Sequence, residues 1–390
     1  MKFLMYGAGS IGRGFIGPLF AGAGYEVVYV DISKPIIDAL NNKRNYQISI
    51  ASETPYNIEV YGVRGVNGLD EEAVIAEIAD CDIMAVSLGT SVLQRIVPVI
   101  AKGFALRIEK CNKPLNVLIC ENLKNADKVL REWLLDALPV ELHQLFNEKC
   151  GLIETAIGRM VPVTDTDSED PLHVVVEEYD FLPIDRDGFI GDPPQIEKLI
   201  PYSPFSFYEE RKLYLHNMGH AICAYLGILN GYDYIYQAIR DPFIRLLTQS
   251  AMIESSSMLS TKYEVPYHKV FYHAEDLLFR FGNAALLDTC ERVGRDPIRK
   301  LGADDRLAGA IKQCFDYGIL PAYICLGYAV ALRFMTDDLK EVQKVSKEIG
   351  KLTDEQISII MKLYDLLSLT PEKLFEATES IKREQRGRIV

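Results

Sequence analysis

Hydrophobic residues follow two patterns along the chain, and the pattern changes near residue 195. Before this point, apolar runs of strand length alternate with longer segments of helical length. The apolar runs are residues 2–6, a run ending at residue 31, and residues 81–86, 115–120 and 151–157. Buried strands that alternate with helices are typical of a parallel sheet covered on both faces. The sequence therefore predicts an α/β domain with a doubly wound sheet over residues 1–195.

Beyond this domain the hydrophobic positions have helical spacing nearly to the C-terminus. Prolines at 193–194 and between 201 and 204 indicate a linker. Helices are expected at residues 205–229, 234–263, 268–281, 304–316, 321–334, 336–351, 354–367 and 371–384. We therefore expect a second, all-α domain over residues 196–390.

Other stretches of the first domain have the polar and apolar alternation of half-exposed strands. Residues 46–50 and 56–63 alternate in this way, and residues 173–178 are β-branched or alternating. The polar, acidic stretch 164–170 has the composition of a turn. We interpret residues 159–192 as a hairpin appended to the sheet.

A glycine motif follows the first apolar run directly and precedes a predicted helix. It consists of Gly7, Ala8, Gly9, Ser10, Ile11 and Gly12. In such a GxGxxG turn, the first glycine permits the turn, the second admits a pyrophosphate, and the third lets the helix pack closely. The helix N-terminus favours the pyrophosphate because its N–H groups are unpaired.

Asp31 ends the second apolar run, about 20 residues beyond the glycines. A carboxylate there accepts hydrogen bonds from an adenosine ribose and repels a 2′-phosphate. The stretch therefore predicts a Rossmann-type domain that binds NAD in preference to NADP. The alternative is a glycine-rich turn in an unrelated α/β protein.

Two later strands also end in short loops with small or polar residues. Gly89 follows the strand at 81–86, and Asn122 follows the strand at 115–120. Doubly wound sheets bind ligands at the carboxyl ends of their strands. Gly89 is therefore expected to border the cofactor, with an ordinary strand-to-helix turn as the alternative, and Asn122 is expected at the same edge.

One helical stretch of the second domain, residues 208–220, carries polar side chains on one face. With 100° per residue and Lys212 at zero, His216 falls at about 40°, Glu209 at about 60°, His220 at about 80° and Asn217 at about 140°. The opposite arc is apolar and is expected to pack in the core. The polar face suits the lining of a substrate site, and a solvated surface is the alternative.

The length of the chain indicates the number of domains, and its net charge excludes some kinds of binding partner. The 390 residues suit two domains, and 48% apolar residues provide a core for each. A net charge of −13 argues against binding of nucleic acid or an anionic membrane surface. The first strand begins at residue 2, unlike a signal peptide, and no apolar run reaches the roughly 18 residues of a membrane span. We expect a cytoplasmic enzyme with a small-molecule substrate and leave its oligomeric state open.

The eight cysteines occur singly, with no CxxC or CxxH spacing. This distribution favours buried thiols over a zinc site or a disulfide framework. We therefore expect no metal in the reaction.

Several of these stretches together resemble the polyol-specific long-chain dehydrogenases, especially the mannitol-1-phosphate 5-dehydrogenase branch of that family. The likeness spans nearly the whole chain: GAGSIGRGFIG at 7–17, ENL at 121–123, RMVP at 159–162, ERKLYLHNMGHAICAYLG from 210, and ERVGRDPIRKLGADDRL at 291–307. The Lys-x4-Asn-x2-His signature of the family falls on Lys212, Asn217 and His220. The resemblance implies NAD-dependent interconversion of mannitol 1-phosphate and fructose 6-phosphate.

The resemblance also implies roles for individual residues. Lys212 becomes the general base, and Asn122 and Asn217 hold the reacting oxygen. Two amide donors would stabilise a developing alkoxide without a metal, and His220 can orient a substrate hydroxyl. Glu209 would either carry the proton outward or pair with a neighbouring cation.

A basic run interrupts the acidic chain after residue 291. The resemblance places Arg295 on the substrate, and the neighbouring Arg299 and Lys300 suit a phosphate. The alternative is a set of surface ion pairs with nearby aspartates, namely Asp296, Asp304 and Asp305.

Two departures from the family pattern leave the sugar open. Gly158 precedes RMVP where the relatives carry Asp, and residues 180–183 replace an SEW-like segment. The alternatives are a free-polyol or hexuronate dehydrogenase, a β-hydroxyacid-type dehydrogenase, and a nucleotide-sensing module without turnover. The last would be expected to lack the base, whereas Lys212 is present.

Overall fold

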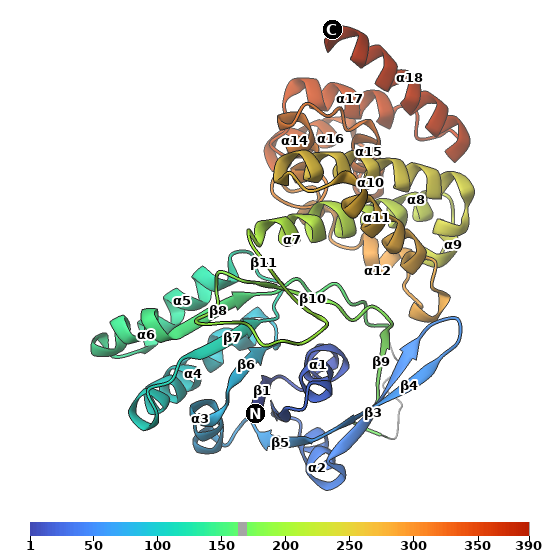
Figure 1. Ribbon diagram of the computed structural model, residues 1–390. Coiled ribbons are helices and arrows are strands. Elements are labelled where there is room, and N and C mark those ends of the chain that lie inside the picture. Colours follow the sequence, from blue (N-terminus) through green and yellow to red (C-terminus); the bar gives the residue numbers. More distant parts are fainter. Residues whose placement is uncertain (163–169, 390) are drawn as a thin grey trace. The chain divides into compact units, whose positions relative to one another are not determined.

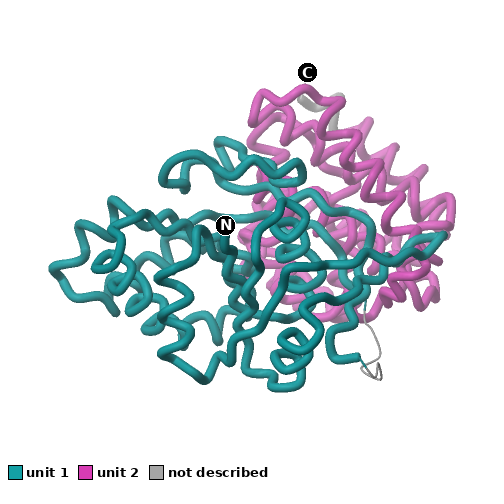
Figure 2. Tube along the Cα trace, turned by 60° about the horizontal axis from the view of Figure 1, so that its bottom comes forward, with its two compact units in different colours: residues 1–206 teal, residues 207–390 magenta. Residues whose placement is uncertain are grey.

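The computed structural model describes residues 1–162 and 170–389, with side chains to residue 384. The chain forms two compact units, Met1–Ser206 and Phe207–Val390, which are coloured separately in Figure 2. The first is α/β and the second is mostly helical, as expected (Figure 1). Residues 163–169, which include most of the expected polar turn, lie outside the description.

A six-stranded sheet in the order β5-β2-β1-β6-β7-β8 forms the centre of the first unit. Its strands are β1 (Lys2–Tyr6), β2 (Glu26–Asp31), β5 (Val63–Asn67), β6 (Ile83–Val86), β7 (Leu115–Ile119) and β8 (Cys150–Glu154). Every neighbouring pair is parallel. This is the strand order of a Rossmann sheet, with the switch point between β1 and β6.

Both faces of this sheet are buried, as parallel sheets require. Along β1, Phe3 and Met5 point into one core, and Leu4 and Tyr6 point into the other. The second core is closed by helices that follow one another along that face, seen together in Figure 1. They are α3 (Glu71–Asp80), α4 (Thr90–Lys110), α5 (Ala126–Ala137) and α6 (His143–Lys149).

The appended hairpin is present, but it lies earlier in the chain than expected. It consists of β3 (Asn45–Ala51) and β4 (Tyr56–Tyr61), which pair antiparallel across a four-residue connection. The expected strand near residue 173 exists as β9 (Val174–Glu177) but pairs in parallel with β3. Our placement of the hairpin at 159–192 was therefore wrong.

The physical reason lies in the sequence after β9. The next strand, β10 (Leu182–Asp185), contains Pro183, which has no N–H for a central ladder. It pairs in parallel with β11 (Leu199–Tyr202) in a separate two-stranded sheet. In the same way, the expected strand at 56–63 divides at Gly62, whose φ of 73° turns the chain from β4 into β5.

The second unit is built around α8 (Met218–Leu229) and α15 (Ala322–Met335), which pack against each other. A Cβ on Gly327 of α15 would lie 2.3 Å from the side chain of Ile222, so only glycine permits this approach. Around the pair lie α9 (Ile235–Arg240), α10 (Pro242–Tyr263), α11 (Tyr267–Phe281), α12 (Cys290–Gly294), α13 (Pro297–Lys300), α14 (Ala308–Asp316), α16 (Leu339–Lys344), α17 (Asp354–Tyr364) and α18 (Pro371–Ile389).

The long helix expected at 234–263 is two helices. Asp241 accepts hydrogen bonds from the backbone N–H groups of Phe243 and Ile244, with Pro242 at the first helical position. This N-cap starts α10 afresh after α9.

The last helix is attached through a buried ion pair. Lys382 of α18 lies 2.9 Å from Oε1 of Glu254 on α10, and Glu254 is 3% exposed. The other carboxylate oxygen accepts hydrogen bonds from the N–H groups of Tyr323 and Ile324 at the start of α15. One side chain therefore connects three helices.

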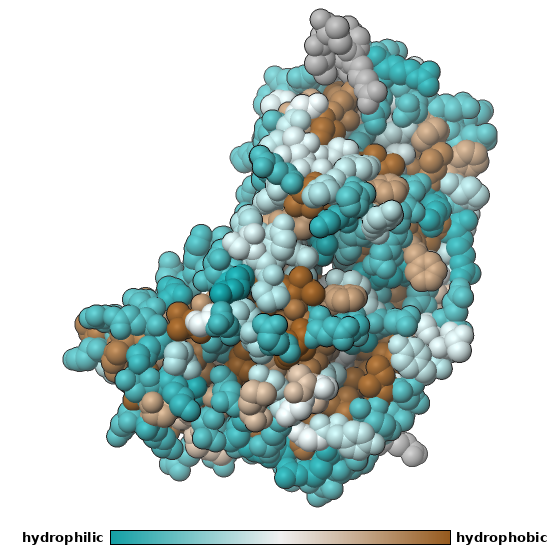
Figure 3. Space-filling view, viewed as in Figure 1, coloured by the Kyte–Doolittle hydropathy of each residue, from teal (hydrophilic) through white to brown (hydrophobic). Residues whose placement is uncertain are grey.

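Much of the face shown in Figure 3 is hydrophilic, with smaller hydrophobic patches between the polar residues. Over residues 1–162 and 170–389, no helix combines the length and the hydropathy that crossing a bilayer requires. The same residues contain no group of three or more His, Cys, Asp or Glu side chains arranged to hold a metal ion.

Candidate active site

The glycine turn after β1 has three glycines in three different environments. Gly7 has a φ of 111°, and a Cβ there would lie 2.2 Å from the carbonyl oxygen of Ser87. A Cβ on Gly12 would lie 2.1 Å from the carbonyl oxygen of Gly7. Gly9 is exposed and has nothing within 4 Å of its Cβ position. The first and third glycines are thus required by the fold, whereas the second borders open space.

Asp31 at the end of β2 is bonded to this turn. Its Oδ2 accepts a hydrogen bond from the N–H of Ala8 at 2.8 Å, and its Oδ1 accepts one from Ser33 at 2.9 Å. Each carboxylate oxygen has a second lone pair, so the group retains acceptor capacity for a ligand. Ser10 is exposed and Ile11 is half-buried beside it.

Two buried arginines donate hydrogen bonds to the glycine turn or to the helical segment that follows it, and sequence reasoning gave neither of them this role. Arg13 donates from Nε to the carbonyl oxygen of Ala8 at 2.5 Å. Arg159, the first residue of the RMVP segment, donates to the carbonyl oxygens of Gly14 at 2.9 Å and Glu177 at 2.7 Å. The position of Arg13, directly after the glycine motif, could have suggested this role. A buried guanidinium group has five N–H donors and needs several acceptors, and the backbone carbonyls of the turn are the nearest ones.

Helical geometry at the turn differs from the usual α-helix. Residues Gly12–Ile16 form a π-helical segment, η1, and α1 (Gly17–Gly22) follows it. Segments of this kind occur frequently at functional sites.

Gly89 lies in the loop after β6, and Asn122 lies in the loop after β7. The carboxylate of Glu121 joins these two loops by hydrogen bonds. Gly89 has a φ of 84° and open space at its Cβ position, and Asn122 is exposed. Glu121, beside Asn122, accepts hydrogen bonds from the N–H groups of Leu88 at 2.6 Å and Gly89 at 3.0 Å. Burial raises the pKa of Glu121, and the two N–H donors offset part of that rise. Our sequence reasoning missed this link, since no local pattern shows which carboxylate reaches a neighbouring loop.

In the second unit, the Lys-x4-Asn stretch is π-helical. Residues Arg211–Asn217 form η3, between α7 (Ser206–Glu210) and α8. In a π-helix the hydrogen bond joins residues i and i+5, whereas an α-helical wheel separates them by about 140°. Lys212 and Asn217 are five residues apart, so they lie closer to one face than the wheel predicted. Both are half-buried.

The expected core arc of this stretch is confirmed, with Tyr214, Leu215 and Met218 buried. His216 is different from our expectation, because it is 7% exposed rather than part of an open polar face. Burial, followed by the positive charge of Arg280, lowers the pKa of His216 well below its usual value. The wider turn of η3 accounts for the difference from the wheel.

His220, in the first turn of α8, stacks on Phe281 with ring centroids 4.8 Å apart. Its Nε2 lies 3.2 Å from Oδ2 of Asp288. Burial alone would raise the pKa of Asp288. The interactions with His220 and Arg292 have the larger combined effect, so the pKa of this carboxyl group is lowered. Glu209 of α7 is half-buried.

Arg295, Arg299 and Lys300 lie in three different environments. Arg299 makes ion pairs with Asp296 at 2.8 Å and Asp305 at 3.1 Å, which is the alternative we considered for this run. Lys300 is 3% exposed, and its ammonium group donates to the carbonyl oxygen of Arg295. Burial, then the charges of Arg306 and Arg299, lower the pKa of Lys300 to about 8. Arg295 is exposed and makes no ion pair within the described part of the chain.

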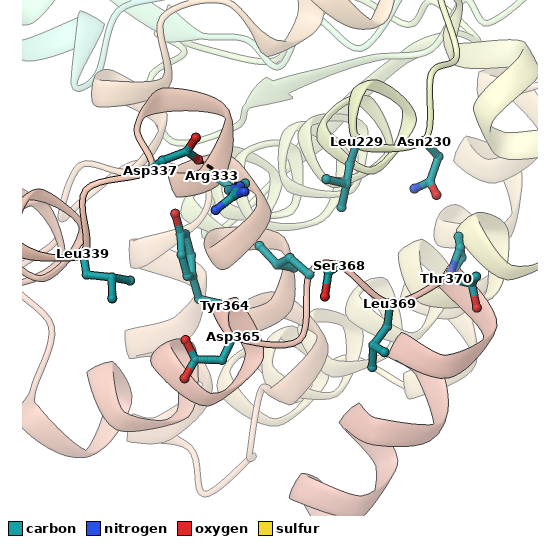
Figure 4. Close-up of a pocket in the computed structure, with 12 residues that line it drawn as sticks. Leu229, Asn230, Arg333, Asp337, Leu339, Tyr364, Asp365, Ser368, Leu369 and Thr370 are labelled. Carbon is teal, nitrogen blue, oxygen red and sulfur yellow. Dashed lines mark ion pairs between the residues drawn. The ribbon is translucent and has the colours of Figure 1, made fainter.

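A separate cavity of about 730 Å³ lies in the helical unit (Figure 4). Arg333, paired with Asp337, and Tyr364 line it. None of the predicted site residues is in its lining. We therefore do not assign this cavity to the candidate residues of either unit.

Family models match the chain in two segments, one in each compact unit. Residues 1–198 match the mannitol dehydrogenase Rossmann domain, and residues 205–371 match the mannitol dehydrogenase C-terminal domain.

Two solved structures have the same fold over nearly their whole length. A D-sorbitol dehydrogenase in substrate-free form is 16% identical with a TM-score of 0.79, covering 97% of this chain and 94% of that one. The mannitol 2-dehydrogenase of Pseudomonas fluorescens, in a ternary complex with NAD and D-mannitol, is 17% identical with a TM-score of 0.72, covering 98% and 94%. With both of its units matched, the chain belongs to the mannitol dehydrogenase family.

Proposed function

We propose that this protein oxidises a polyol phosphate with NAD, interconverting mannitol 1-phosphate and fructose 6-phosphate. The observation that carries the proposal is the π-helical segment η3, which brings Lys212 and Asn217 toward one face within a matched domain of the family. Lysine and asparagine side chains supply a base and an amide donor, the two groups that oxidation of an alcohol without a metal requires.

The glycine turn fits a dinucleotide. Gly9 leaves open space where a pyrophosphate would approach the backbone, and Asp31 ends β2 with acceptor capacity for a ribose. Gly7, Ala8, Ser10, Ile11 and Gly12 would form the remainder of this cradle, with Gly89 as a further border. A dinucleotide held there would supply the acceptor for the hydride that leaves the alcohol carbon.

The residues of this chain handle the proton and the oxygen. Lys212, as the neutral amine, takes the proton of the reacting hydroxyl while the hydride leaves the carbon, so that a ketone and a protonated lysine remain. Asn122 and Asn217 donate hydrogen bonds to the oxygen as negative charge develops on it. His220 orients a substrate hydroxyl. In the reverse direction Lys212 returns the proton.

A phosphate on the substrate is proposed because Arg295 is exposed and makes no ion pair within the described residues, whereas Arg299 is paired with aspartates and Lys300 is buried. Guanidinium groups bind phosphate with charge-assisted, often paired hydrogen bonds. The second candidate function is oxidation of a free polyol, and it is favoured by the two structural neighbours, whose names are sorbitol and mannitol 2-dehydrogenase.

The test is turnover with NAD against mannitol 1-phosphate, mannitol and hexuronates, in the native enzyme and in Lys212→Ala. The variant should lose about 10²- to 10⁴-fold in kcat, the usual contribution of a general base, while NAD affinity stays nearly unchanged. Lys269→Ala, an exposed lysine of α11, is the matched control.

Near-native kcat in Lys212→Ala would contradict the role of the base. Equal activity on mannitol and mannitol 1-phosphate would favour the free-polyol function instead.

A further inference from the structure

Asp288 is a buried carboxylate in the helical unit that the proposed mechanism does not use. It is 7% exposed and lies between the short helical turn η4 (Ala284–Leu286) and α12. Its backbone is fixed, because its carbonyl oxygen accepts a hydrogen bond from the N–H of Ile235 and Tyr234 bridges to Thr289. The position of its carboxylate is therefore set by the fold.

The two oxygens of Asp288 face different partners. Oδ1 accepts hydrogen bonds from Nε of Arg292 at 2.9 Å and from Nη2 of the same side chain at 2.5 Å. Oδ2 lies 3.2 Å from Nε2 of His220. The two atoms are close, but the N–H of His220 is not in line with that oxygen, so no aligned hydrogen bond joins them. Hydrogen bonds at catalytic groups commonly align only when substrate binds.

The ring of His220 is confined on its other sides as well. It stacks on Phe281 with a 15° angle between the planes, and the His216 ring lies 6.2 Å away. Its side chain is 16% exposed. Nε2 of the ring thus faces Asp288, and no hydrogen bond to Nδ1 is found among the described residues.

We propose, on the basis of the proposed function, that Asp288 is a positioning residue that fixes the tautomer of His220. A carboxylate beside Nε2 favours the proton on that nitrogen. The lone pair then lies on Nδ1, which can accept a hydrogen bond from a substrate hydroxyl. Arg292 takes part indirectly, because it holds Oδ1 and turns Oδ2 toward His220.

The arrangement makes Asp288→Asn an informative variant. The guanidinium group of Arg292 has only donors, so the amide oxygen of the new side chain must face Arg292. Its NH₂ group then faces His220 and requires a lone pair on Nε2, which moves the proton to Nδ1. The variant keeps the size and shape of the side chain and inverts the tautomer.

Asp288→Asn should lower kcat/KM for polyol oxidation by about 10- to 100-fold, by analogy with carboxylates that orient metal-binding histidines. NAD affinity should be unchanged. In a His220→Ala background the same substitution should have no further effect, because its influence passes through His220. Asp337→Asn is the matched control, since it also removes an i,i+4 aspartate–arginine pair in this unit, with Arg333.

A double variant keeps the test decisive. In Asp288→Asn combined with Arg292→Met, the amide is free to turn its oxygen to His220, so activity should recover in part relative to Asp288→Asn alone. A purely structural ion pair predicts the opposite, because the double variant loses more interactions.

A spectroscopic readout separates this inference from the proposed function. The chain has six histidines, so ¹⁵N-histidine spectra can be assigned by substitution. The spectra should show the proton on Nε2 of His220 in the native protein and on Nδ1 in Asp288→Asn. The same tautomer in both proteins would overturn the inference whatever the activity, as would a native-like kcat/KM in an active enzyme. A native protein that oxidises no polyol would contradict the proposed function alone.

Discussion

Alanine substitutions at Gly9 and Gly12 should separate binding from folding within one turn. A Cβ on Gly12 would lie 2.1 Å from a backbone oxygen, so the chain has to shift. Overpacking of this kind costs about 1–3 kcal/mol. For a unit of this size each kcal/mol lowers Tm by about 2–4 °C, which gives a decrease of about 2–12 °C.

Gly9→Ala meets nothing within 4 Å, so its Tm should stay within about 2 °C of the native value. If a pyrophosphate passes over Gly9, the same methyl group crowds the ligand. A cost of about 1–3 kcal/mol then weakens NAD binding by about 5- to 150-fold.

The assay is thermal unfolding without cofactor, together with NAD titration followed by protein fluorescence or calorimetry. The reasoning fails if Gly9→Ala binds NAD as tightly as the native protein. It also fails if Gly12→Ala unfolds at the native temperature, because the glycine would then not be required by packing.

Further predictions concern the cofactor, the substrate, the absence of a metal and the last helix. Asp31→Ala should weaken NAD binding and reduce the preference over NADP, and a native enzyme that binds NADP more tightly would contradict the role of Asp31. Arg295→Ala should raise KM for a phosphorylated substrate by about 10- to 150-fold, which corresponds to about 1.5–3 kcal/mol of lost binding energy, with little change for a free polyol. Equal effects on both substrates would contradict the role of Arg295. Activity should survive dialysis against a chelator, and loss that zinc restores would refute this. Lys382→Met removes the cation beside the buried Glu254 and should cost up to about 3–5 kcal/mol in urea unfolding at a pH above 7, where the native carboxyl is ionised. Burial raises the pKa of Glu254 to about 7. The contribution of this group to stability is therefore complete below about pH 4.5 and is lost as the pH rises through 7. Stability that increases from pH 4.5 to 7 would contradict the raised pKa of Glu254.

The sequence was sufficient for five of the six strands of the parallel sheet, because each of them is a largely apolar run of strand length. Phe3 and Leu4, for example, point to opposite faces, yet both are buried. β5 contains Arg64 and Gly65, so it is not an apolar run and was not predicted as a strand of this sheet. The hairpin was misplaced because pairing between distant segments, such as β3 with β9, leaves no local signal. The helix at 234–263 was predicted as one because apolar spacing continues across Asp241, where only the cap shows the break.

Some residues of the candidate site could likewise be predicted from the sequence, and others could not. Glycines with positive φ and a lysine at fixed spacing are visible in a sequence, since they follow from local geometry. The partners of Glu121 and Asp288 are not, because those contacts join residues 32 and 68 positions apart. The burial of His216 was missed because an α-helical wheel cannot represent the wider turn of η3.

That wider turn has a consequence for insertions and deletions in this chain. The helix before η3 and the helix after it are both regular α-helices, so η3 takes up one residue more than α-helical turns would need. Removing one residue between Lys212 and Asn217 would let the stretch become α-helical. Because the wider turn already absorbs the extra residue, the helices on its two sides would keep nearly the same rotation relative to each other. Lys212 and Asn217 would then be four positions apart and would still lie on one face. Loss of one residue in this segment is thus expected to be better tolerated than a further insertion.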